Sequence, residues 1–169
     1  MKPIRQNILI APILAALVIS GAAFYSGCGS SQNVRFTEDL VVRDAYSGKV
    51  YGAWPLEASA EGPGEFALEF VHSVNQSPVR EIFQAEDKTI KLKAMRFYSF
   101  GAGMPRDLEE GQTLSRDGDA MLITGYRASF KELSIIVGTI SDHLLFINGR
   151  VESLWEICGK NTHIKIRCE

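Results

Sequence analysis

Short runs in which apolar residues alternate with others, separated by turn residues, constrain the fold of this 169-residue chain most strongly. Phe66, Leu68 and Phe70 recur at a period of two, which is typical of a β-strand with one buried face. No long stretch follows the 3.6-residue period of an amphipathic helix. We therefore expect a strand at 66–71 and further strands at 38–43, 49–56, 79–85, 89–99, 120–126, 132–138, 143–147 and 164–167.

Turn residues separate these strands and indicate how they are paired. Tyr46-Ser47-Gly48 lies between the first two strands, and Asn148-Gly149 is the strongest short hairpin signal in the chain. The segment 151–157 fits either a strand or one helical turn. Evenly spaced strands without intervening helices predict an all-β fold, either an antiparallel β-sandwich or a partly closed barrel, in a single domain.

The first 28 residues have the organisation of an export signal. Lys2 and Arg5 precede an apolar stretch at 8–24, and Ser26-Gly27-Cys28 forms a junction of small residues. This arrangement resembles the signal of bacterial lipoproteins, in which the cysteine after the junction carries lipid and becomes the mature N-terminus. An uncleaved membrane anchor and a secreted soluble protein are the alternatives.

All three interpretations place the rest of the chain on the periplasmic side of a bacterial inner membrane. We expect residues 1–28 to be the signal or anchor, 29–37 a flexible tether, and 38–169 the β domain. Attachment would be through lipid on Cys28 or through the N-terminal helix, so the expected location is the cell envelope.

Charge and cysteine content limit the possible partners. Without residues 1–28, the chain has 16 basic and 20 acidic residues, a balance of −4 that excludes a nucleic-acid binder. If Cys28 is lipidated, Cys158 and Cys168 remain as a pair in an oxidising compartment, where we expect a disulfide. Two cysteines with only His163 between them form a poor metal site.

The most distinctive polar residues lie around 71–81. His72 is in phase with Phe66, Leu68 and Phe70, and Glu81 is in phase with Val79 and Phe83, so both should face the core. If 73–78 form a hairpin loop, His72 opposes Val79 and becomes a diagonal neighbour of Glu81, about 7–8 Å away. A buried carboxylate needs such a partner. The pair would either lock the hairpin or belong to a ligand site.

A second unusual stretch runs from Ser99 to Pro105. Gly101 and Gly103 allow backbone conformations that are closed to other residues, so the loop could offer amides to an anion. It is not a dinucleotide-binding motif, because no helix pattern follows it.

Together these two stretches resemble a family of small exported domains of unknown function, encoded beside TRAP transporters of the TAXI type. The resemblance rests on His72-Ser73-Val74, Pro78-Val79, Glu81, Gly101-Ala102-Gly103 and Pro105, and on the strand order from about Asp39 onward. It implies a link to the permease or the solute-binding protein of such a transporter, but no known activity.

We therefore expect a non-enzymatic accessory or ligand-binding module, with no cofactor and no metal. Its candidate site comprises His72, Ser73, Glu81, Gly101 and Gly103. A periplasmic hydrolase and a purely structural envelope protein are the alternatives. Adjacent residues on a strand point to opposite faces, so His72 is badly placed to activate Ser73 as a nucleophile.

Overall fold

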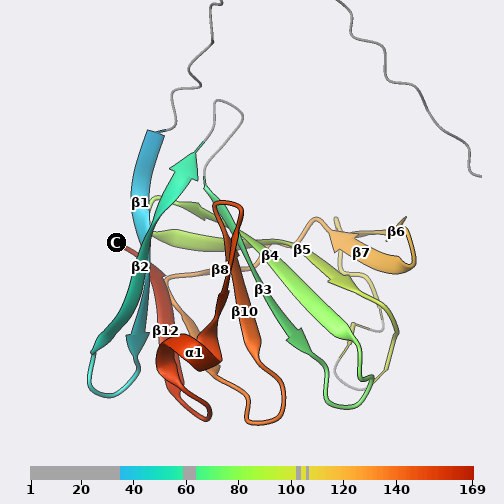
Figure 1. Ribbon diagram of the computed structural model, residues 1–169. Helices are drawn as coiled ribbons and strands as arrows, with labels where there is room; N and C mark the ends of the chain where they lie inside the picture. The colour runs from blue at the N-terminus through green and yellow to red at the C-terminus, as the bar shows by residue number, and fades with distance from the viewer. Residues whose placement is uncertain (1–34, 59–63, 102–103, 106) are drawn as a thin grey trace, which may run out of the picture. The chain divides into compact units, whose positions relative to one another are not determined.

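The computed structural model describes residues 35–58, 64–101, 104–105 and 107–169, and these form twelve β-strands and one short helix (Figure 1). The strands make two antiparallel sheets that pack face to face, so the predicted β-sandwich is confirmed. Cys28, Gly103 and residues 29–34 of the expected tether lie outside the described residues.

The smaller sheet has four strands and joins the two ends of the described chain. Its order is β2-β1-β12-β9, so the last strand lies beside the first. The strands are β1 (Arg35–Asp44), β2 (Val50–Ala58), β9 (Leu133–Ile136) and β12 (His163–Cys168). Arg35 pairs with Ala58, so β1 begins earlier than the predicted boundary between tether and domain at residue 38.

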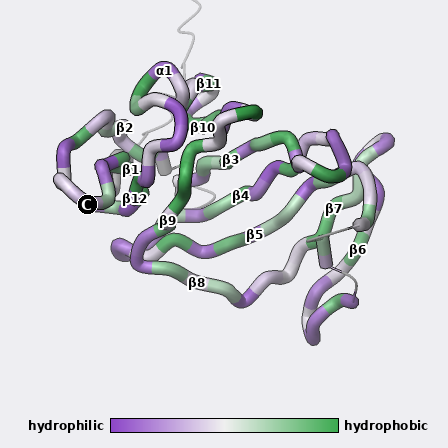
Figure 2. Tube along the Cα trace, turned by 90° about the horizontal axis from the view of Figure 1, so that it is seen from below, coloured by the Kyte–Doolittle hydropathy of each residue, from purple (hydrophilic) through white to green (hydrophobic). Residues whose placement is uncertain are grey.

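The larger sheet has eight strands. Its order is β11-β10-β3-β4-β5-β7-β6, and β8 also pairs with β5. The strands are β3 (Glu65–Val71), β4 (Pro78–Glu86), β5 (Thr89–Phe97), β6 (Thr113–Asp117), β7 (Ala120–Thr124), β8 (Ser129–Phe130), β10 (His143–Ile147) and β11 (Arg150–Ser153). Figure 2 shows β1, β2 and β12 gathered at one side, while β4 and β5 run across to β7 and β6 at the other.

The main hydrophobic core lies between the two sheets. Val42 and Ile166 of the four-stranded sheet belong to one buried cluster with Leu68, Phe83 and Leu145 of the eight-stranded sheet. Burying each such side chain contributes about 1.5–3 kcal/mol. A second, smaller cluster contains Val79, Phe97, Met104 and Ile123. Its buried members come from β4, β5, β7 and the segment around Met104, with none from the four-stranded sheet.

The predicted hairpins are confirmed, and the ambiguous segment at 151–157 turns out to contain both structures. Asn148 and Gly149 have φ values of 49° and 71°, the left-handed pair that a two-residue turn between β10 and β11 requires. β11 ends at Ser153, whose hydroxyl oxygen accepts a hydrogen bond from the Glu156 amide at 3.1 Å. This N-cap starts the helix α1 (Leu154–Cys158).

The expected disulfide is absent, because Cys158 and Cys168 lie at opposite ends of β12. The carbonyl of Cys158 accepts a hydrogen bond from the Thr162 hydroxyl at 2.8 Å, just before β12 begins. Cys168 ends the strand opposite Leu40, and five residues of strand span about 16 Å. A disulfide needs Cα atoms within about 7 Å. Burial raises the pKa of Cys158 to about 11 and that of Cys168 to about 12.

Candidate functional site

A pocket of about 430 Å³ lies at one end of the sandwich, where the chain crosses from one sheet to the other. One wall is the end of β3 with the following turn, and the other is the connection from β9 to β10. We call it the crossover pocket. It is lined by Phe70, Val71, His72, Ser73, Gln76, Gly138, Thr139, Ile140, Ser141 and His143.

The turn between β3 and β4 is tighter than predicted, and this changes the partner of His72. The His72 amide donates to the Ser77 carbonyl at 2.9 Å, so only residues 73–76 form the loop. Phe70 therefore opposes Val79, and Glu81 opposes Leu68. The predicted contact between His72 and Glu81 is wrong, because the two residues lie four positions apart along the hairpin, about 13 Å.

On the other side of β3, the strand β10 brings His143 close to His72. His143 opposes Phe70 on β3, which makes His72, two residues further along, its diagonal neighbour at about 7–8 Å. His143 stacks on the Phe70 ring with a centroid separation of 5.4 Å. Both histidines line the crossover pocket.

Backbone amides fix the orientation of both imidazole rings. The Nδ1 atom of His72 accepts hydrogen bonds from the amides of Val74 and Asn75, each at 3.3 Å. The Nδ1 atom of His143 accepts one from the Gly138 amide at 3.2 Å. Burial lowers the pKa of His143, with nearby Asp142 opposing the shift, so the neutral ring is favoured.

The connection from β9 to β10 is held against helix α1. Asp142 accepts hydrogen bonds from the Ser153 hydroxyl at 2.5 Å and from the Trp155 amide at 3.0 Å. The Trp155 indole donates to the Gly138 carbonyl at 2.6 Å. A Cβ atom at Gly138 would lie 2.4 Å from the Ser141 carbonyl oxygen, so this tight path requires glycine. The pocket wall is therefore anchored at both of its ends.

Of the other predicted site residues, Ser73 lines the pocket. Gly101 lies outside the pocket and against the β3–β4 turn. The Asn75 side-chain amide donates to the Ser99 carbonyl at 3.3 Å, and its oxygen faces Gly101. The contacts of Asn75 therefore place the segment from Ser99 to Gly101 beside the β3–β4 turn.

Glu81 lies apart from the pocket, between the two hydrophobic clusters. Its neighbours in phase on β4 are Val79 in one cluster and Phe83 in the other. Tyr126 packs against both clusters, and its buried hydroxyl has no hydrogen-bond partner within the described ranges. Burial raises the pKa of Glu81; burial also raises the pKa of Tyr126, with smaller effects from the charges of Glu81 and Glu109.

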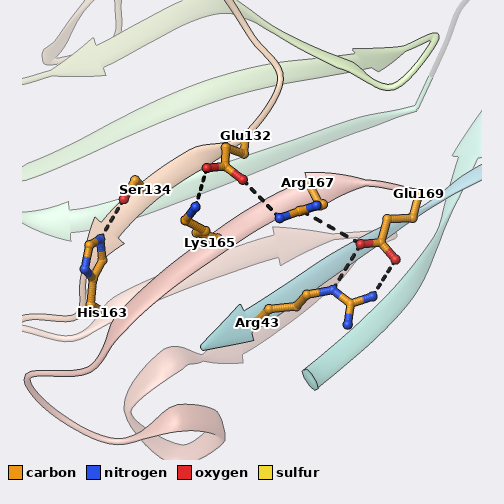
Figure 3. Close-up of polar contacts among 7 residues, drawn as sticks. All are labelled: Arg43, Glu132, Ser134, His163, Lys165, Arg167 and Glu169. Atoms are coloured by element: carbon orange, nitrogen blue, oxygen red, sulfur yellow. Dashed lines mark hydrogen bonds and ion pairs between the residues drawn. The ribbon is translucent and has the colours of Figure 1, made fainter. Parts of the chain in front are cut away.

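The outer face of the four-stranded sheet carries a chain of ion pairs (Figure 3). The Glu132 carboxylate pairs with Lys165 at 2.7 Å and Arg167 at 3.1 Å. Glu169 accepts two hydrogen bonds from Arg43, at 3.0 and 2.6 Å, and lies 3.8 Å from Arg167. Each of these three cationic side chains pairs with at least one of the two carboxylates, so the described residues of this group leave none of its members unpaired.

The same face holds a contact between serine and histidine that the sequence did not reveal. The Ser134 hydroxyl lies 2.6 Å from Nε2 of His163, and the Tyr46 hydroxyl lies 3.2 Å from its Nδ1 (Figure 3 shows the first contact). Tyr46 is 85% exposed, so the group lies on open surface and not in the pocket.

Sequence reasoning missed His143, which lines the pocket, and Asp142, which holds the pocket wall against α1. The signal for His143 was present, because it is in phase with the buried residues Leu145 and Ile147. Within the described part of the chain, no three side chains of His, Cys, Asp or Glu form a group that could hold a metal ion. No helix of the described residues is long and apolar enough to cross a bilayer.

Comparison with known proteins gives one family assignment. No curated protein and no solved structure matches the chain significantly. The family model described as Domain of unknown function (DUF1850) matches residues 66–154, just over half of the chain. This segment contains every residue that lines the crossover pocket. The chain therefore belongs to the DUF1850 family of domains of unknown function.

Proposed function

We propose that this chain is an exported, membrane-tethered module that binds a small ligand in the crossover pocket and assists a TAXI-type TRAP solute transporter. The observation that carries the proposal is the pocket itself. It combines two oriented imidazoles, His72 and His143, with an aromatic wall at Phe70, and its volume of about 430 Å³ suits a small molecule.

The role proposed is non-catalytic. His72 and Ser73 are adjacent, and the Nδ1 atom of His72 is occupied by backbone amides. Among the described residues, the Ser73 hydroxyl has no hydrogen bond to any base that could activate it as a nucleophile. A few well-placed polar groups in a mainly apolar pocket suit binding without chemistry.

The N-terminal sequence supports the proposed location on the periplasmic side of the inner membrane. Lys2, Arg5, the apolar stretch and Cys28 form a lipoprotein-like signal. The Cys28→Ala variant should be exported but should no longer incorporate a labelled fatty acid. Equal labelling of wild type and variant would remove the lipid anchor from the proposal and leave an uncleaved N-terminal segment or a secreted, soluble protein as the alternatives.

Exposed apolar residues at the pocket end support a protein partner. Ile140, which lines the pocket, is 92% exposed, and Val74 in the β3–β4 turn is 65% exposed. Such residues close to a ligand site provide contact area for a protein that delivers or receives the ligand. The resemblance described above favours the permease or the solute-binding protein of a TRAP transporter.

In vivo photocrosslinking tests this partner. A photoreactive amino acid at Ile140 should crosslink to the permease or the solute-binding protein in cells that contain the full chain. The matched control is the same amino acid at Val151, which is 54% exposed on β11. Equal crosslinking from both positions, or crosslinking to neither transporter component, would contradict the proposed partner.

A further inference from the structure

We infer that the crossover pocket binds a small carboxylate with an apolar body, an assignment that rests on the proposed ligand-binding function. The pocket combines hydrogen-bond donors with apolar surface, and no charged side chain is among the described residues that line it.

The hydrogen bonds that orient the two imidazoles determine which ring nitrogen can donate to a ligand. A nitrogen that accepts a hydrogen bond carries no proton, and a neutral imidazole carries one proton in total. Since Nδ1 accepts from backbone amides in both His72 and His143, the proton of each neutral ring is on Nε2. The described residues provide no hydrogen-bond partner for either Nε2–H group. The pocket wall thus presents two N–H donors from rings that are diagonal neighbours.

A cationic ligand has nothing to pair with in this pocket. No Asp or Glu is among the lining residues, and the adjacent Asp142 carboxylate is already occupied by Ser153 and Trp155. A metal ion is also disfavoured, because it would require an unprotonated Nε2 and would therefore place a proton on each Nδ1, facing a backbone N–H. A carboxylate accepts hydrogen bonds only, and so matches the two Nε2–H donors.

The remaining walls suit an apolar body. Phe70 stacks on His143, and Val71 and Ile140 continue the apolar surface to the rim, where they are 42% and 92% exposed. Ser73 and Thr139 add hydroxyl groups that can donate to a second carboxylate oxygen.

Histidine-selective NMR of the full chain in lipid nanodiscs tests the ligand class. The chain has three histidines, so labelling gives three ring signals, and His163 on the outer sheet face is an internal control. The probes are hexanoate, hexan-1-ol and hexylamine at pH 7.5. Hexanoate should shift the Nε2 signals of His72 and His143 saturably, at concentrations at least tenfold lower than either other probe, and should leave His163 unchanged.

Two variants test whether hexanoate binds at the rim of the crossover pocket. Ile140→Asp removes apolar wall and places a negative charge at the exposed rim; it should weaken hexanoate binding about fivefold to tenfold and hexan-1-ol binding less, because the charge repels only the carboxylate. Ile136→Asp, at a residue 61% exposed on β9, should leave hexanoate binding unchanged.

The outcomes test the class of ligand separately from the proposed binding role of the pocket. If hexan-1-ol or hexylamine shifts His72 and His143 as readily as hexanoate, the carboxylate assignment is wrong, while the proposed ligand-binding function stands. If none of the probes shifts either signal, both the carboxylate assignment and the proposed binding role of the pocket are overturned.

Discussion

Glu81 and Tyr126 place polar groups where the two hydrophobic clusters meet. No ion pair or hydrogen bond to the Glu81 carboxyl is found among the described residues, and the Tyr126 hydroxyl is buried without a partner. Burial of an unpaired polar group costs about 1–3 kcal/mol. Glu81 was expected to stabilise the hairpin through His72, whereas the observed register leaves it as a source of instability when it is ionised.

Replacement of Glu81 by glutamine should therefore stabilise the protein at neutral pH. Because burial raises the pKa of Glu81 above 4.5, the protonated form stabilises the fold below pH 4.5, and this contribution is lost as pH rises through the folded-state pKa. The Glu81→Gln variant should match wild type near pH 4 and unfold at a higher temperature at pH 7.5. Melting curves at both pH values measure this.

Glu69→Gln is the matched control on the neighbouring strand. Glu69 pairs with Arg80 at 2.8 Å, so its replacement should lower stability slightly, by about 1 kcal/mol or less. A lower melting temperature for Glu81→Gln at pH 7.5 would show that the carboxylate has a stabilising partner.

Protonation of His143 should lower the free energy of unfolding in mild acid. Its pKa is lowered mainly by burial, so the neutral ring contributes fully above pH 6.5, and the contribution is lost as pH falls through the folded-state pKa. Histidine-selective NMR should find that His143 titrates below pH 6.5. A value above 6.5 would show that Asp142 outweighs burial.

At the scale of elements, the connection from β9 to β10 depends on one carboxylate. Asp142 holds the N-terminal end of α1 through Ser153 and Trp155, and Trp155 in turn holds Gly138 at the start of the pocket wall. The helix has only five residues, so its position comes from these contacts and not from its own stability.

The Asp142→Ala variant should destabilise the domain by about 1–3 kcal/mol, because it leaves the Trp155 amide and the Ser153 hydroxyl without an acceptor. Urea denaturation measures the loss. Asp119→Ala, in the exposed turn between β6 and β7, is the control and should change stability by less than about 0.5 kcal/mol. Equal stability of the two variants would show that the helix contact is unimportant.

Most strands could be predicted because one of their faces is buried. The exceptions are β6, whose five residues are all exposed, and β8, which has only two residues; neither provides a hydrophobic period. The candidate site was predicted less well. Periodicity correctly placed Glu81 beside buried residues, but it does not determine how many residues a turn uses. Two residues fewer in the β3–β4 loop were enough to move Glu81 four positions away from His72, while His143 lies near His72 on the other side of β3, on β10.

At the scale of the whole molecule, packing of two free cysteines against the core and ion pairs on the outer face stabilise the four-stranded sheet without a disulfide. Cys168 lies in the main core, and Cys158 packs against it from α1. The four-stranded sheet is joined across its outer face by ion pairs from Glu132 to Arg43. Such partly exposed pairs contribute little individually, about 0–1 kcal/mol, and mainly favour the correct strand order.

The two C-terminal cysteines should therefore remain unlinked in protein taken from an oxidising compartment. Their raised pKa values leave little thiolate at neutral pH, so they should react slowly with a maleimide in the folded state and quickly in denaturant. Mass spectrometry after this labelling counts the free thiols. A peptide that joins Cys158 to Cys168 in the unreduced native protein would contradict the observed structure.

The position of β12 determines when folding can finish. This strand fills the space between β1 and β9, and the amide and carbonyl of Glu169 bond to those of Asp39, so the end of the chain completes the sheet that its beginning starts. Until β12 has joined the sheet, β1 and β9 have no shared neighbour, and Val42 has no Ile166 to pack beside it. Contacts of such long range form late. Export through a membrane channel, as proposed above, requires an unfolded chain, and a sheet that closes only when its last strand is added fits that requirement.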